Sequence, residues 1–179
     1  DRPLYNLLRV RQDISSASTA GLTFTNRREG DRFNRVLGAD TRILFQREYS
    51  VNAHVAASST RDASGTHNAP LLNVAFNRTG YRIGNLYSIN AVGPEIAAAA
   101  GFVPRTDFVR GSFYNRLSFY GRPGSLVEIW LIRQGLDGLW LYDKFRDGDS
   151  VQETKFQLEN VFNIRGGWVV SLTPVIESF

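Results

Sequence analysis

The stretch "YSVNAHVAASST", residues 49–60, separates into two classes of side chain when every second residue is taken. One class is apolar: Tyr49, Val51, Ala53, Val55 and Ala57. The other is polar, with Ala56 as the one exception: Ser50, Asn52, His54, Ser58 and Thr60. A period of two residues predicts a β-strand with one apolar and one polar face. The apolar face could pack in the core of a soluble sandwich, or it could contact lipid.

The same alternation recurs along most of the chain, so the sequence predicts an all-β protein of roughly ten antiparallel up-and-down strands, within the size range of small bacterial barrels. No segment predicts a long helix. The regular segments are LLRVRQD, GLTFTN, VLGADTRILFQR, LNVAFN, YRIGNLYSIN, VRGSFYNRLSF and SLVEIWLIR, and less regular strands are expected in GLWLYDKF, ETKFQLENVF and GGWVVSLTPVI. In SLVEIWLIR, the alternation sets Val127, Ile129 and Leu131 against Glu128 and Trp130.

Composition fits a single domain, residues 1–179, with enough apolar content to fold. Hydrophobic residues make up 42% of the 179 residues and charged residues 21%, with a formal net charge of +4 and a pI near 9.7. The arginines are scattered through the strands rather than gathered in a basic stripe, which argues against a nucleic-acid partner.

Two residue types are absent from the sequence. Without cysteine the chain has no disulfide framework, thiolate metal site or cysteine nucleophile. Without methionine, Asp1 is not a translation start, so the chain is expected to be processed or to be a piece of a longer protein. The longest apolar run, Ile96–Ala100, is far shorter than the roughly 20 residues of a spanning helix. A membrane could therefore be crossed only by strands closed into a barrel.

Connections and the polar strand faces favour such a barrel over a sandwich. Links such as QREY, NRTGY and GRPGS are short, whereas NRREGDRFN, TRDASGTHNAP and AVGPEIAAAAGFVPRTD are long, and the two kinds alternate as they do in outer-membrane barrels. Pro94 and Gly101 predict a short helix inside the third long link. Aromatic residues near strand ends suit an interfacial girdle: Tyr49, Tyr81, Phe119 and Tyr120. Charged residues at mid-strand suit an aqueous lumen: Arg9, Arg11, Asp40, Arg42, His54, Arg110, Arg116 and Glu128.

Four segments in order resemble a known family: RVRQDISSASTAGLTFTNR, NRVLGADTRILF, GFVPRTD and GRPGSLVEIWLIRQG. They are similar to the C-terminal outer-membrane-type β-barrel domain, a domain of unknown function, of bacterial envelope proteins that carry an N-terminal carbohydrate-binding-family-9-like domain. The most specific piece is Gly101–Arg105 with Asp107. The resemblance covers nearly the whole chain but only an internal part of the family's barrel, and it supplies no catalytic residues.

Several residues invite a chemical role, and for each a structural role is favoured. His54 and His67 have no ligand cluster at metal spacing around them. The spacing of Asp143, Asp147 and Asp149 does not fit an EF-hand, and the Asp-Gly pair in this segment is an ordinary turn signal. Glu128 has no identifiable second carboxylate for acid–base work. The tryptophans, Trp130, Trp140 and Trp168, are expected in packing or a girdle rather than in a sugar-stacking platform.

The sequence therefore predicts an outer-membrane β-barrel, or part of a larger barrel, acting as a membrane-embedded scaffold or passage with a link to carbohydrate handling. We expect no enzymatic activity, no cofactor and no bound metal. The expected partners are outer-membrane lipid, carbohydrate and an envelope protein, and no nucleic acid. The candidate binding residues are Phe102, Arg105 and Asp107, with bracing of the barrel wall as the alternative role. The alternative function is that of a soluble all-β sandwich module that binds a glycan or a protein.

Overall fold

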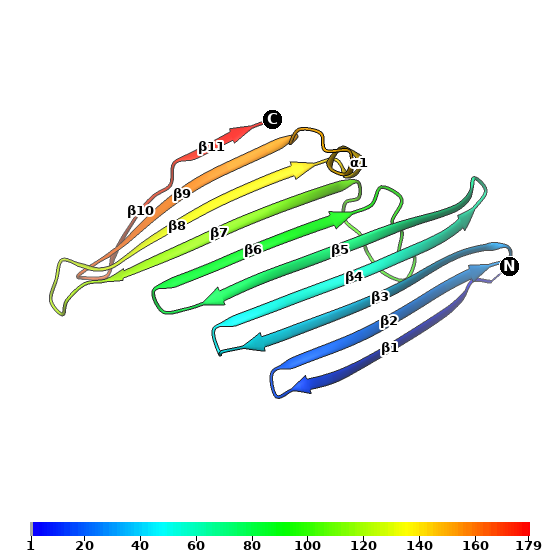
Figure 1. Ribbon diagram of the computed structural model, residues 1–179, viewed down its shortest axis with the longest axis horizontal. Coiled ribbons are helices and arrows are strands. Elements are labelled where there is room, and N and C mark those ends of the chain that lie inside the picture. Colours follow the sequence, from blue (N-terminus) through cyan, green and yellow to red (C-terminus); the bar gives the residue numbers. More distant parts are fainter. Residues whose placement is uncertain (1) are drawn as a thin grey trace.

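The computed structural model describes residues 2–179 and contains one antiparallel sheet of eleven strands joined mostly in up-and-down order (Figure 1). Neighbours in the sequence are neighbours in the sheet from β1 to β10, and β11 pairs with β9 beside β10. The strands are β1 (Leu4–Ser15), β2 (Ser18–Glu29), β3 (Arg32–Phe45), β4 (Tyr49–Asp62), β5 (Gly65–Thr79), β6 (Ile83–Val92), β7 (Phe108–Tyr120), β8 (Val127–Trp140), β9 (Glu153–Ile164), β10 (Trp168–Leu172) and β11 (Val175–Ser178).

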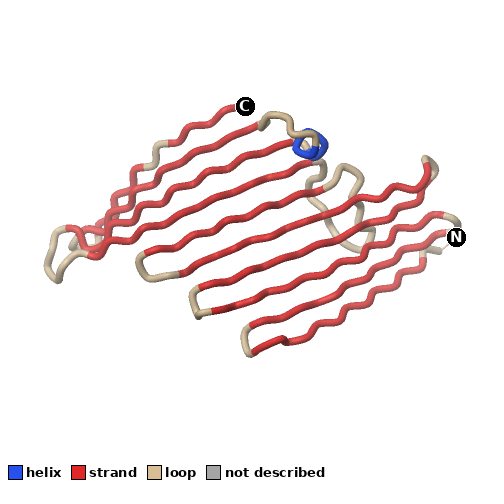
Figure 2. Tube along the Cα trace, in the orientation of Figure 1, coloured by secondary structure: helices blue, strands red, loops and turns tan. Residues whose placement is uncertain are grey.

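The predicted all-β, antiparallel up-and-down fold is confirmed, but the sheet of residues 2–179 is not closed into a barrel. β1 lies at one edge and β10 with β11 at the other, on opposite sides of the sheet (Figure 2). The sheet is a single layer, so a sandwich of two packed sheets is not the architecture of the described residues. Both edges leave backbone groups free to pair with another strand.

The two ends of the sheet differ in their connections. At one end, which we call the short-turn end, the links are residues 16–17, 46–48, 80–82, 121–126 and 165–167. At the other, the loop end, they are residues 30–31, 63–64, 93–107 and 141–152. The helix α1 (Tyr142–Arg146) lies in the last of these.

The connections and one strand boundary differ from the sequence prediction. NRREGDRFN and TRDASGTHNAP are not long loops: the strands run through them into tight turns at 30–31 and 63–64, because their polar side chains face water while the backbone stays paired. Residues 94–101 form turns rather than a helix. GLWLYDKF is not one strand, since β8 ends at Trp140 and α1 follows.

Candidate functional site

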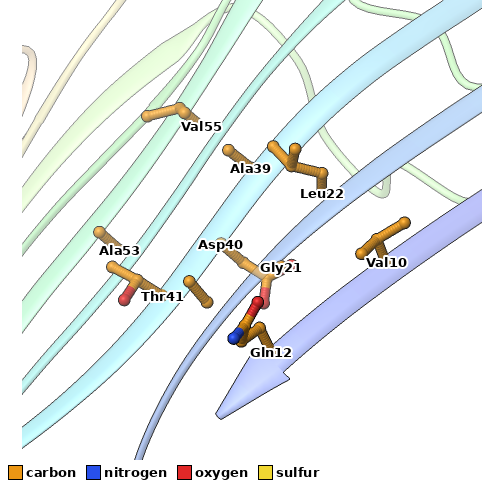
Figure 3. Close-up of a pocket in the computed structure, with 10 residues that line it drawn as sticks. Val10, Gln12, Gly21, Leu22, Ala39, Asp40, Thr41, Ala53 and Val55 are labelled. Atoms are coloured by element: carbon orange, nitrogen blue, oxygen red, sulfur yellow. The ribbon is translucent and has the colours of Figure 1, made fainter. Parts of the chain in front are cut away.

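One face of the sheet, which we call the apolar face, carries the side chain of Val55 and is exposed. Through the strand register, Val55 shares a row with Leu72 and Ala39 on its neighbours. Figure 3 shows Val10, Leu22, Ala39 and Val55 along neighbouring strands, around a shallow depression of about 430 Å³. Val55 is 46% exposed and Leu22 58%. These side chains have no covering layer in the part of the chain that the structure describes.

Charge is nearly absent from the apolar face. Among the strand residues that the register assigns to this face, the charged side chains are all arginines near strand ends: Arg28, Arg35 and Arg61 toward the loop end and Arg78 at the short-turn end. Arg78 pairs with Glu48 of the adjacent turn at 3.3 Å. Along β4, the apolar run from Tyr49 to Ala57 measures about 26 Å at about 3.3 Å per residue. At the strand tilt of about 40° that is typical of outer-membrane barrels, a run of this length would project to about 20 Å, comparable with their apolar band of about 25 Å.

Aromatic side chains form a continuous row on the apolar face toward the short-turn end. Phe45 stacks on Tyr49 with ring centroids 5.3 Å apart, and Tyr49, Phe76, Tyr87 and Phe113 continue the row at spacings of 6.0, 6.3 and 5.7 Å. Several of these rings were not among the residues that the sequence predicts for a girdle. The register that aligns them across five strands could not be read from the separate segments.

A second aromatic group corrects the predicted orientation of β8. Trp130 lies on the apolar face between Phe119 and Phe162, with ring centroids 5.1 and 5.7 Å away. Ile129 and Leu131 therefore point to the opposite face, contrary to the sequence prediction. A register irregularity between Val127 and Ile129 shifts the alternation, and Glu128 falls at this bulge rather than in the row of charged residues.

The opposite face, which we call the charged face, carries His54 and holds most of the ion pairs within strands. Arg9 on β1 reaches across β2 to Asp40 on β3, with Nη2 2.9 Å from Oδ1. Gly21 makes this possible, because a Cβ there would lie 2.9 Å from the Asp40 carboxylate and 3.2 Å from the guanidinium. Further across the sheet, Arg133 pairs with Glu159 at 2.8 Å.

A polar depression of about 270 Å³ lies over β5 to β9 and is lined mainly from the charged face, by residues that include Tyr114, Arg116, Arg133 and Glu159. The Tyr114 hydroxyl donates to Asp137, which also accepts from Ser112 at 2.6 Å. The Tyr114 ring passes close to Gly135, where a Cβ would lie 2.7 Å from the ring. Hydrogen bonding through Asp137 therefore fixes the position of Tyr114 at this depression.

The link 93–107 folds back over the charged face and covers its small apolar cluster. Ile96 packs with Ala69 and Val92, all less than 9% exposed, and Val103 and Phe108 adjoin them. Asn34 fixes the link, because its amide donates to the Ala97 carbonyl at 2.9 Å and accepts from the Ala99 N–H at 2.8 Å.

The predicted binding residues lie in this link but do not converge. Phe102 is 87% exposed. Arg105 stacks over Phe108 at 5.4 Å from the ring centroid. Asp107 adopts a positive φ of 61° and accepts a hydrogen bond from the backbone N–H of Tyr142 at 3.3 Å. Arg105 and Asp107 contact neighbouring parts of the chain and Phe102 is open to solvent, so both bracing and ligand binding by these residues stay predictions.

A Ser–His–Glu cluster at the loop end was not expected from the sequence. His67 Nε2 lies 2.8 Å from Ser64 Oγ, and His67 Nδ1 lies 3.1 Å from Glu95 Oε1. The Ser64 hydroxyl, however, donates its one proton to Asp62 Oδ1 at 2.6 Å, so it cannot also donate to the imidazole as a nucleophile would. These bonds from Ser64 lower the pKa of Asp62. The cluster ties the β4–β5 turn to the link 93–107.

The remaining residues singled out in the sequence lie apart from one another. The acidic residues around α1 pair with nearby cations, as in Lys144–Asp149 at 2.9 Å. Within residues 2–179, no group of histidine and acidic residues is arranged to hold a metal ion. No helix in the same range is long and apolar enough to cross a bilayer.

Comparisons with known proteins identify no relative. No protein-family model matches the sequence, and neither a curated protein nor a solved structure matches it. Membership of the envelope-protein family therefore stays a prediction from the quoted motifs.

Proposed function

We propose that this chain forms part of the wall of an outer-membrane β-barrel, with the apolar face toward lipid and the charged face toward an aqueous interior. The observation that carries the proposal is the contrast between the faces. The apolar face exposes a band without Asp, Glu or Lys among the described residues, bounded by arginines, whereas the charged face holds the mid-strand ion pairs. A lipid-facing strand needs this division, because charges on the lipid side are destabilising and charges in a lumen can pair.

The shape of the sheet supports an orientation. At the short-turn end, the turn 46–48 joins Phe45 directly to Tyr49, so the aromatic row lies next to the turn. At the loop end, β2 to β5 continue beyond the apolar band into polar rows, and the link 93–107 folds inward. Outer-membrane barrels have short periplasmic turns and longer extracellular parts. We therefore place the loop end outside the cell and the short-turn end in the periplasm.

The free edges favour a larger barrel as the complete structure. In lipid every backbone N–H and C=O must be paired, so open sheet edges do not persist there. We infer that β1 and the β10–β11 edge pair with further strands of the same barrel. The charged face then lines its lumen, and the polar depression at Tyr114 and Arg116 faces a solute inside it. The family resemblance adds carbohydrate as the expected class of solute.

Labelling of single-cysteine variants on intact bacteria tests the orientation, since the chain has no cysteine of its own. Ser64→Cys is at the loop end and Thr79→Cys at the short-turn end. A membrane-impermeant maleimide should label Ser64→Cys alone. Labelling of Thr79→Cys alone, or of both equally, would contradict the proposal.

Conductance separates a passage from a scaffold. The complete protein reconstituted in a planar bilayer should conduct ions if the charged face lines an open lumen, and Arg116→Gln should change its ion selectivity relative to Arg28→Gln on the apolar face. Insertion without conductance would leave the scaffold role and exclude the passage.

A further inference from the structure

Three arginines lie close together on the apolar face, at the boundary of its apolar band toward the loop end of the sheet. Arg35 on β3 lies in the row next to the Leu37–Ala57–Pro70 row, and Arg28 and Arg61 on the flanking strands lie in the row beyond. All three residues are exposed. None of them forms an ion pair with another described residue, and the nearby acids, Glu29 and Asp62, point to the charged face.

The local contacts of these arginines leave guanidinium donors free. Arg35 stacks over Phe33 at 4.4 Å from the ring centroid, and its Nε donates to the Asn26 side chain at 3.3 Å. Arg28 Nε donates to the Gly30 carbonyl at 3.2 Å. A guanidinium carries five N–H donors, so most donors on both residues remain available to an anion. Arginine also matches the geometry of phosphate oxygens by paired hydrogen bonds.

Directly beside Arg35 the surface is hollowed and apolar. A depression of about 490 Å³ is lined by Phe24, Leu37, Ala57 and Pro70, with Arg35 and Asn68 also in the lining. The depression arises because small Ala57 and ring-shaped Pro70 stand beside the larger Phe24 and Leu37 in one row. It lies on the band that faces lipid in the proposed orientation, and a hydrocarbon chain is the chemistry that fits it.

We propose that Arg28, Arg35 and Arg61, together with this depression, form a binding site for a phosphorylated lipid of the outer leaflet. The phosphate binds the arginines and an acyl chain lies in the depression below them. The inference rests on the proposed membrane location, because only a bilayer presents a phosphate and a hydrocarbon chain side by side to this surface. Charge complementarity selects an anionic headgroup, since the strand residues on the apolar face include no carboxylate and none of the three arginines has an ion-pair partner among residues 2–179.

Binding is measured on the full chain in neutral maltoside micelles with three probes: dioctanoyl phosphatidic acid, dioctanoyl phosphatidylcholine and inorganic phosphate. We expect phosphatidic acid to bind more tightly than the other two. Arg35→Gln should weaken its binding about fivefold, which is the effect of one basic residue at an anionic membrane surface, and Arg28→Gln/Arg35→Gln/Arg61→Gln by more. The matched control, Arg11→Gln/Arg42→Gln/Arg110→Gln, removes the same charge from the other face and should bind as the unmodified chain does.

A second variant tests the acyl-chain part of the site. Ala57→Phe fills the depression and should weaken phosphatidic acid binding while the arginines remain. Equal affinity for inorganic phosphate and phosphatidic acid would show a free-anion site and overturn the proposal, as would equal affinity for phosphatidylcholine or equal weakening by the control triple variant. Flotation of the chain with phosphatidylcholine liposomes tests membrane insertion separately. Loss of flotation contradicts the proposed function, whereas the micelle measurement decides the lipid site.

Discussion

Apolar side chains on the two faces of this sheet have different surroundings. On the charged face, the apolar residues Ala69 on β5 and Val92 on β6 are covered by the chain's own link 93–107 and are less than 9% exposed. On the apolar face, Leu22, Leu37 and Val55 are at least 46% exposed. The link 93–107 therefore buries apolar surface on the face that holds the ion pairs. On the apolar face, Val109 beside Trp140 is buried where α1 contacts β7, whereas the band over β2 to β4 is uncovered and suits a nonaqueous solvent.

The largest expected effect comes from placing a charge on the uncovered face. Val55→Arg should destabilise the protein in bilayers by about 2–4 kcal/mol, because it puts an unpaired cation into hydrocarbon. His54→Arg projects from the charged face opposite Asp40 and should be nearly neutral. Reversible urea unfolding in lipid vesicles measures both. Similar destabilisation by the two variants would mean that the faces do not meet different solvents.

Overfilling distinguishes a packed site from a fluid one. Ala57 on β4 and Ala69 on β5 belong to adjacent cross-strand pairs, so their side chains point to opposite faces of the sheet. Ala69 is 4% exposed beneath the link 93–107, whereas Ala57 on the apolar face is exposed to solvent. Ala69→Phe should cost about 1–3 kcal/mol, because a packed cluster cannot accommodate a ring without shifting. Ala57→Phe and Val55→Phe should be tolerated, because lipid chains rearrange. A strong loss of stability for Val55→Phe would indicate a packed protein core at the apolar face.

A smaller loss of stability is expected when the hydrogen bonds from Asn34 to the link 93–107, which we call the clamp, are removed. Asn34 is 6% exposed and satisfies both Ala97 and Ala99, so Asn34→Ala should leave backbone groups of the link without partners and cost about 1–2 kcal/mol. Hydrogen exchange should quicken in residues 93–107. Asn52→Ala on β4 is the control, since the Asn52 side chain makes no hydrogen bond among the described residues. Unchanged exchange in Asn34→Ala would exclude the clamp.

The strand pattern could be predicted from the sequence because alternation is a local property. Residues such as Val55 and His54 were correctly assigned to opposite faces from their neighbours alone. The register was not local: the aromatic row from Phe45 to Phe113 depends on how five strands align. The bulge before Ile129 reversed the predicted orientation of β8 for the same reason.

The candidate site could be predicted only in part from the sequence. The link containing Phe102, Arg105 and Asp107 was singled out, but the residues that fix it, Asn34 and Ser58, come from distant strands. The Ser64–His67 contact is close in sequence and could have been suspected, whereas Glu95 is brought to it only by the fold. The polar segments NRREGDRFN and TRDASGTHNAP were predicted to be loops, because a strand whose side chains face water has the same polar composition as a loop.

The smallest expected effect concerns the loop end and its pH dependence. Hydrogen bonds from the Ser64 side chain and backbone hold the pKa of Asp62 below its ordinary value of 3.8. A depressed carboxyl pKa stabilises the turn above the ordinary value, and that stabilisation is lost as pH falls through the folded-state pKa. Ser64→Ala should raise the pKa of Asp62 in an NMR titration of its side-chain carboxyl group. An unchanged Asp62 pKa would show that the Ser64 side chain does not donate to this carboxylate.

The most direct test that the two faces meet different solvents is a scan of nitroxide spin labels along β4. The labels are attached to introduced cysteines, and the sequence has no cysteine of its own that would also be labelled. Spin labels are placed singly at Ala53, His54, Val55, Ala56 and Ala57 in the protein reconstituted in vesicles, and their collision rates with oxygen and with a water-soluble nickel chelate are compared. We expect oxygen access to dominate at 53, 55 and 57 and nickel access at 54 and 56, with a period of two. Nickel access at all five positions, or a label at 55 shielded from both reagents, would contradict a lipid-facing apolar surface.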